Sequence, residues 1–328
     1  MKDMKLALKL GMGFGIVLIL TVVVGLAGWN GISGVTDRTL KVEGVSALGD
    51  DLSDARIAVR NFMLDNKKAD EATKATTKLD EMKKEATELR DKFTDPANKA
   101  QMEAIAKASA AYRDEFQIYA DFAHKRAATM EKIREAANVA LKETQAIADD
   151  QEAQLKETVE KGKKDDDIAA NRGEVFARVL DKYGKIDKAN EVISEFLTAR
   201  KNEKELIINN DEKFAHAVVE SAAGIKKKIE EMIASYKLEK NREQGKKALA
   251  AMGVYEGLFK EYRDLMQKQA EVFKTMGTAA NEAVKFADEA IKDQKGKMQS
   301  QIGSANTLII SGSLLAIILG LIVAFVIT

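Results

Sequence analysis

The chain has 328 residues, with one proline, no cysteine and 52 basic residues balanced by 52 acidic ones. A net charge of zero argues against nucleic acid as a partner, because that binding needs a basic excess to neutralise phosphates. Without cysteine, disulfides and Cys-ligated zinc are excluded. A single proline, 32% charged residues and no alternating β-branched run together predict an all-α chain of long helices.

An uncharged stretch at residues 10–36 follows lysines at positions 2, 5 and 9. Its apolar centre, residues 12–29, is close to the ~20 residues that a helix needs to cross a bilayer. Trp29 stands where an interfacial aromatic residue would anchor the far end of such a helix. A cleaved signal peptide is the alternative, but no Ala-x-Ala cleavage site is evident, so we expect an uncleaved anchor.

A second uncharged stretch, residues 307–328, predicts a second membrane span. The chain stops where basic residues would be expected beyond such a span, so we expect a fragment that lacks its output domain. The lysines before the first span place the N-terminus in the cytoplasm. We therefore divide the chain into a cytoplasmic N-terminus (1–9), a first transmembrane helix (10–32), a periplasmic sensor region (33–305) and a second transmembrane helix (306–328).

An internal repeat organises the region between the spans. Residues 112–151 recur without a gap as residues 255–294, with thirteen identities in forty positions. A period this long favours duplication of a multi-helix module over a solenoid. Apolar residues spaced by three and four predict six helices, with breaks near 65–68, 94–96, 162–167, 209–211 and 241–245. The expected fold is two stacked four-helix bundles that share two long helices, flanked by two transmembrane helices.

This organisation resembles the helical bimodular sensor domain of bacterial chemoreceptors (methyl-accepting chemotaxis proteins) and of some sensor histidine kinases. The resemblance covers the whole chain and includes the Ala-Arg-x-x-x-Arg-x-Phe-Met-Leu stretch at residues 55–64. Members with known ligands hold small organic acids between helices through arginine side chains. The resemblance therefore implies Arg56 and Arg60 as ligand-binding residues. Residues 280–305 contain no Arg or His, which speaks against a dicarboxylate as the ligand.

Arg200 is a further candidate, on physical grounds, because it continues an apolar seam and so points a cation into the bundle. A buried charge needs a partner. That partner is either a carboxylate on a neighbouring helix or an anionic ligand held by the planar guanidinium.

Counting helical rise from the membrane places Arg56 about 33 Å along its helix, at ~1.5 Å per residue. The same rise reaches Tyr119 on the first long helix and Asn281 on the second. Both are candidate ligand-binding residues, and both belong to the repeated stretch. The plainer interpretations are a solvated arginine flank, a core tyrosine and an asparagine between helices.

No enzyme activity, metal site or cofactor is expected. His124 and His216 are the only histidines, and neither has a second ligand at metal-binding spacing. No phosphate-binding glycine pattern or nucleophile elbow occurs.

We interpret the chain as the sensor part of an inner-membrane chemoreceptor with two spans, a homodimer that binds a small anionic ligand in the periplasm and signals inward. The stimulus could instead arrive through a periplasmic binding protein. Two alternatives stay open. One is the sensor of a histidine kinase, and the other is a membrane-tethered helical scaffold without a ligand. The sequence does not name the ligand.

Overall fold

The computed structural model describes residues 6–164 and 168–327. In this part of the chain every regular element is a helix, which confirms the all-α prediction. The six helices are α1 (Leu6–Leu64), α2 (Ala69–Lys92), α3 (Pro96–Lys164), α4 (Ile168–Asn209), α5 (Glu212–Ser235) and α6 (Glu239–Ile327). Residues 1–5 of the expected cytoplasmic N-terminus, and residues 165–167 of the break expected at 162–167, lie outside the described residues.

The predicted breaks at 65–68, 94–96 and 209–211 are confirmed, and the last two have a clear local cause. Pro96 occupies the first turn of α3, and the Asp95 carboxylate accepts a hydrogen bond from the Ala97 N–H at 2.9 Å. Asp211 caps α5 in the same way, accepting from the Lys213 N–H at 3.0 Å. Asn210, just before this cap, has a positive φ of 49°, a conformation that asparagine tolerates better than most residues.

The predicted break at residues 241–245 is wrong, because α6 begins earlier, at Glu239. Asn241 and Gly245 are poor helix formers, yet both lie inside the helix. Asn241 is buried, and its amide donates to Asp150 at 2.7 Å and accepts from Gln151 at 3.1 Å. These hydrogen bonds to α3 stabilise a helical conformation that the local sequence disfavours.

The helices form two compact units. The first contains the chain up to Ala120 and again from Glu271, and the second contains Asp121–Ala270. The long helices α3 and α6 therefore each contribute to both units, whereas α1 and α2 belong to the first unit and α4 and α5 to the second. The repeat predicts a short helix pair followed by a long helix in each copy, and the two helix pairs do fall in separate units, each of which also holds a segment of both long helices.

In the first unit α1 packs along α2. The apolar residues of α1 that recur at spacings of three and four are buried throughout: they are Val45, Leu48, Leu52, Ala55, Val59 and Phe62. Phe62 meets Phe116 of α3 edge to face, with ring centroids 5.6 Å apart. Such aromatic pairs add stability beyond that of the apolar area they bury.

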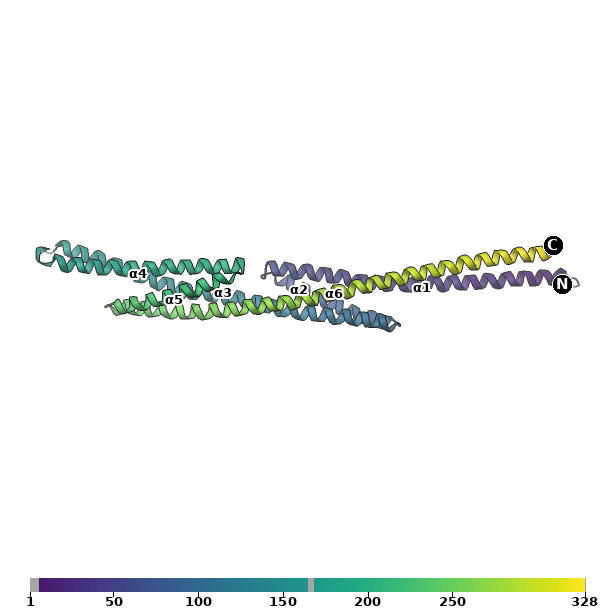
Figure 1. Cartoon of the computed structure of the whole chain (residues 1–328), viewed down its shortest axis with the longest axis horizontal. Coiled ribbons are helices and arrows are strands. Elements are labelled where there is room, and N and C mark those ends of the chain that lie inside the picture. The colour runs from purple at the N-terminus through teal and green to yellow at the C-terminus, as the bar shows by residue number, and fades with distance from the viewer. Residues whose placement is uncertain (1–5, 165–167, 328) are drawn as a thin grey trace. The chain divides into compact units, whose positions relative to one another are not determined.

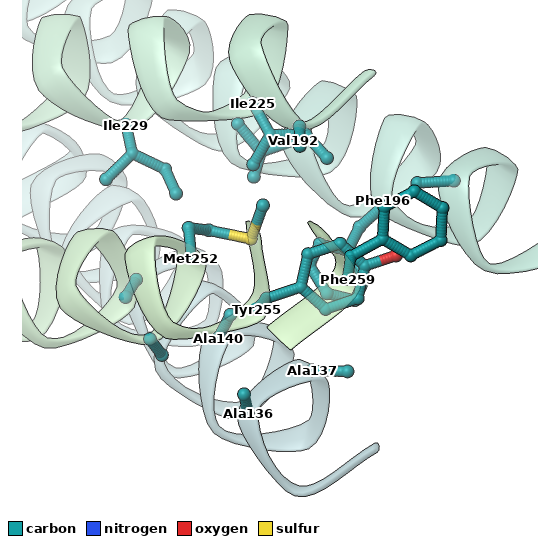
Figure 2. Packing of buried hydrophobic residues seen from close by; sticks show 14 of the residues in the cluster. Ala136, Ala137, Ala140, Val192, Phe196, Ile225, Ile229, Met252, Tyr255 and Phe259 are labelled. Carbon is teal, nitrogen blue, oxygen red and sulfur yellow. The ribbon is translucent and has the colours of Figure 1, made fainter. Parts of the chain in front are cut away.

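In the second unit an aromatic cluster fills the core, as Figure 2 shows. The Tyr255 ring lies between Phe196 of α4, at 5.6 Å, and Phe259 of α6, at 6.4 Å. Small residues of α3 face this cluster and let the helix approach closely, and aliphatic residues of α4 and α5 complete it. The small residues are Ala136, Ala137 and Ala140, and the aliphatic ones are Val192, Ile225 and Ile229.

Two helices in the described part of the chain, α1 and α6, are long and apolar enough to cross a membrane. Their apolar ends run alongside each other within the first unit, so that the start of α1 and the end of α6 lie together (Figure 1). Glycines allow this approach. A Cβ at Gly31 would lie 3.0 Å from that of Ala305, and one at Gly312 would lie 3.1 Å from a methyl group of Val24.

Candidate ligand-binding site

A cavity of about 430 Å³ lies in the first unit, between α1, α3 and α6. This volume falls within the ~300–1,000 Å³ typical of small-molecule sites. One face of α1 supplies half of the lining, Tyr112 is the contribution of α3, and α6 supplies the opposite wall. The lining residues are Ser53, Arg56, Ile57, Val59, Arg60, Met63, Tyr112, Phe273, Met276, Gly277, Ala280 and Asn281.

Arg56 and Arg60 supply the positive charge of the cavity. Four residues apart on α1, they share a helix face. Two other arginines of the first unit hold carboxylates: Arg90 pairs with Asp91 at 3.0 Å, and Arg113 pairs with Asp114 at 2.8 Å. By contrast, neither Arg56 nor Arg60 has a hydrogen bond or ion pair with a protein group among residues 6–164 and 168–327. Two guanidinium groups in one cavity are therefore available to an anion.

Tyr112 presents a hydroxyl group to the same cavity. Its side chain is only 3% exposed, and the hydroxyl has no hydrogen-bond partner within the described residues. Burial raises the pKa of Tyr112 to about 12, against the opposing effect of the Arg56 charge. The phenol is therefore protonated at neutral pH and can donate a hydrogen bond to an acceptor in the cavity.

The cavity also has an apolar side. Ile57 and Phe273 leave 45% and 48% of their surface exposed, while Met276 of the same lining is buried. Phe273 is supported from behind by Tyr119, whose ring centroid lies 6.3 Å away at an interplanar angle of 51°. The cavity thus combines the cationic pair of α1 with apolar surface that both α1 and α6 contribute.

Three of the predicted ligand residues, Arg56, Arg60 and Asn281, line this one cavity. Tyr119 is not among the lining residues. It stands one layer back, against Phe273, and Tyr112 takes the position that Tyr119 was expected to occupy. The two tyrosines are seven residues apart on α3, which is two helical turns, and they lie on the same face. An error of two turns in the estimated rise along the helix therefore selects Tyr119 in place of Tyr112. Tyr112 also lies in the repeated stretch, and this was the feature of the sequence that could have identified it as a candidate ligand-binding residue.

Arg200, the fifth predicted residue, belongs to the second unit. Its guanidinium already holds both carboxylate oxygens of Glu203 at 2.7 Å, and Glu203 also accepts from the Tyr255 hydroxyl at 3.1 Å. The partner is therefore neither a ligand nor a carboxylate of a neighbouring helix, the two alternatives that the sequence left open, but a carboxylate of α4 itself, three residues along. Burial raises the pKa of Glu203, while Arg200 and Tyr255 act in the opposite direction. The charge of Arg200 is thus neutralised within the protein.

No group of three or more His, Cys, Asp or Glu side chains in the described part of the chain is arranged to hold a metal ion.

The described chain thus has two helical units that share two long helices, and its two candidate membrane spans both belong to the first unit. A family model described as the helical bimodular sensor domain matches residues 29–305. Because this match covers most of the chain, the chain belongs to that family.

Two curated relatives are chemoreceptors of Pseudomonas putida. The methyl-accepting chemotaxis protein McpS is 34% identical over 106 residues, which make up 32% of this chain and 17% of that protein. The methyl-accepting chemotaxis protein McpQ is 27% identical over 135 residues, 40% of this chain and 21% of the relative. The chain thus spans about a fifth of the length of the curated relatives it matches. The family predicted from the sequence is confirmed.

Proposed function

We propose that this chain is the sensor region of a chemoreceptor and that its stimulus is a small organic anion bound between α1, α3 and α6. The observation that carries the proposal is the pair Arg56 and Arg60, which share one cavity without a carboxylate partner, beside the protonated Tyr112 hydroxyl. Charge-assisted hydrogen bonds from guanidinium to carboxylate are among the strongest polar contacts in proteins.

The proposed topology is a homodimer in the bacterial inner membrane, with the two spans on either side of a periplasmic sensor. The cavity is lined by α1 and α6, and these same two helices continue into the candidate spans. A ligand that touches both helices favours one packing of α1 against α6 over another. The size of this shift is set by the difference between the ligand's affinities for the two packings, and no catalytic step is required.

Binding is tested with the full 328-residue chain in lipid nanodiscs, titrated with a panel of small carboxylates by calorimetry. Replacement of Arg56 or Arg60 by alanine removes a charged hydrogen bond, and we expect a ~10- to 100-fold loss of affinity. Arg90→Ala is the matched control, because Arg90 lies in the same unit, is exposed and pairs with Asp91. Carboxylate binding that survives both substitutions would refute the assignment. Absence of any carboxylate binding would favour a scaffold or a stimulus delivered by a periplasmic binding protein.

Signalling is tested by cysteine cross-linking, which the cysteine-free chain makes unambiguous. Cysteines at Gly31 and Ala305 join α1 to α6 where a Cβ at Gly31 would be 3.0 Å from that of Ala305. A bound ligand is expected to change the rate at which this pair oxidises in membranes. A pair at Val24 and Gly312, nearer the ends of the helices, reports whether the change continues along the spans. Equal rates with and without a bound ligand would contradict the proposed helix displacement.

A further inference from the structure

We infer that the ligand of this cavity is an amphipathic monoanion, with one carboxylate head and a compact apolar body, such as an aromatic or branched-chain acid. The inference rests on the proposed function and narrows the class of ligand. It follows from how charge and apolar surface are distributed around the cavity.

The positive charge is confined to one wall. Among the lining residues the only cations are Arg56 and Arg60, one turn apart on α1. The opposite wall, on α6, contains Phe273, Met276, Gly277 and Ala280, with Asn281 as its polar member. Lys285, the next cation along α6 in this direction, is outside the lining and pairs with Glu289. A carboxylate bound at the arginines is well matched, whereas a second carboxylate directed towards α6 would lose water without gaining a cation.

The apolar surface of the cavity is partly exposed to solvent. Ile57 of α1 and Phe273 of α6 keep 45% and 48% of their surface accessible although both line the cavity. A hydrocarbon or ring placed against them removes this surface from water, which is favourable in proportion to the area covered. Tyr119 packs against Phe273 and holds the aromatic wall in place before a ligand arrives.

Gly277 leaves room for the body of such a ligand. Apart from its chain neighbours and the backbone of its own helix, a Cβ built at this position meets no atom within 4 Å, although the residue lines the cavity. This open space allows a test by substitution. The side chain of a leucine at position 277 fits there and occupies the volume that the apolar body of the ligand would use. Gly253 of the second unit is equally open and is not a lining residue, so Gly253→Leu is the matched control.

The test uses the full chain in lipid nanodiscs and four defined probes: phenylacetate, acetate, succinate and the uncharged 2-phenylethanol. We expect phenylacetate to bind at least tenfold more tightly than acetate, succinate or 2-phenylethanol. Gly277→Leu should lower the affinity for phenylacetate at least tenfold and change the affinity for acetate less than twofold. Gly253→Leu should change neither affinity. Arg56→Ala should lower the affinities for phenylacetate and for acetate to a similar extent. Circular dichroism confirms that each variant retains its helix content.

The outcomes separate the two proposals. If succinate binds more tightly than phenylacetate and still depends on Arg56, the amphipathic class is overturned but the anion-sensing function stands. If Gly277→Leu weakens acetate as much as phenylacetate, the apolar body does not occupy the space beside α6 and the inference fails. If no probe binds, or if none depends on Arg56, both the inference and the proposed function are overturned.

Discussion

Tyr112 and Tyr255 occupy the same position in the two copies of the repeat, but their hydroxyl groups have different surroundings in the structure. Both side chains are buried, at 3% and 0% exposure. The Tyr255 hydroxyl donates to a Glu203 carboxylate oxygen at 3.1 Å, whereas the Tyr112 hydroxyl faces the cavity. Replacing each tyrosine by phenylalanine removes one oxygen atom from equivalent places and should give opposite results.

Tyr255→Phe is expected to destabilise the second unit. The Glu203 side chain is only 2% exposed, so water cannot replace the lost donor, and leaving a buried acceptor short of a partner costs ~1–3 kcal/mol. Arg200 still holds both carboxylate oxygens, which places the expected loss at the lower end, ~1–2 kcal/mol. For a unit of this size each kcal/mol lowers Tm by ~2–4 °C, so the melting temperature should fall by ~2–8 °C.

Tyr112→Phe should leave stability within ~0.5 kcal/mol of the parent chain, because no hydrogen bond within the described residues is lost. Its effect should appear instead as weaker anion binding, since the phenol is the only donor that α3 offers to the cavity. Thermal and urea denaturation, followed by circular dichroism, measure the stability of both variants. Equal destabilisation by the two substitutions, or none by Tyr255→Phe, would refute this reasoning.

Three further outcomes follow from buried or capping groups. Phe116→Ala and Phe259→Ala, at equivalent repeat positions with 0% and 2% exposure, should each cost ~3–5 kcal/mol in urea denaturation, and losses below 1 kcal/mol would contradict the described packing. Because burial raises the folded-state pKa of Glu203 above its ordinary value of 4.5, its contribution to stability is greatest below that value and is lost as pH rises through the folded pKa. Glu203→Gln should remove this component, so the parent should lose stability relative to the variant between acid and neutral pH; the opposite slope would show that Arg200 dominates. Asp211→Ala should cost ~1 kcal/mol by removing the N-cap of α5, whereas Lys68→Ala, at the α2 N-cap position without a side-chain cap bond, should change stability by less than half as much.

Most of the fold could be predicted from the sequence because the signals are local. Apolar residues at spacings of three and four predicted the helices, including the buried face of α1, and the breaks predicted near 94–96 and 209–211 fall where α3 and α5 begin. The repeat predicted that the helix pairs α1–α2 and α4–α5 fall in separate units. The prediction of where α6 starts was wrong, because Asn241 and Gly245 have low intrinsic helix propensity. The hydrogen bonds of Asn241 to Asp150 and Gln151 of α3 override that preference.

The site was predicted less completely, since its residues come from three helices. Arg56 and Arg60 were implied by the resemblance, and Asn281 by counting helical rise. The same count chose Tyr119 over Tyr112, because small errors in rise accumulate along a helix. For Arg200, the sequence left a ligand and a protein carboxylate as competing partners, and the conformation of Glu203 decided between them.

The sequence by itself therefore determined the helices, their buried faces, the repeat and the two candidate spans, because hydrophobic period and length are properties of one continuous segment. Only the tertiary structure decided which side chains meet. Arg56 and Asn281 are more than two hundred residues apart in sequence, and they line one cavity because the packing of α1 against α6 sets the register between those helices. Register depends on how side chains of both helices interlock, and neither segment specifies it alone.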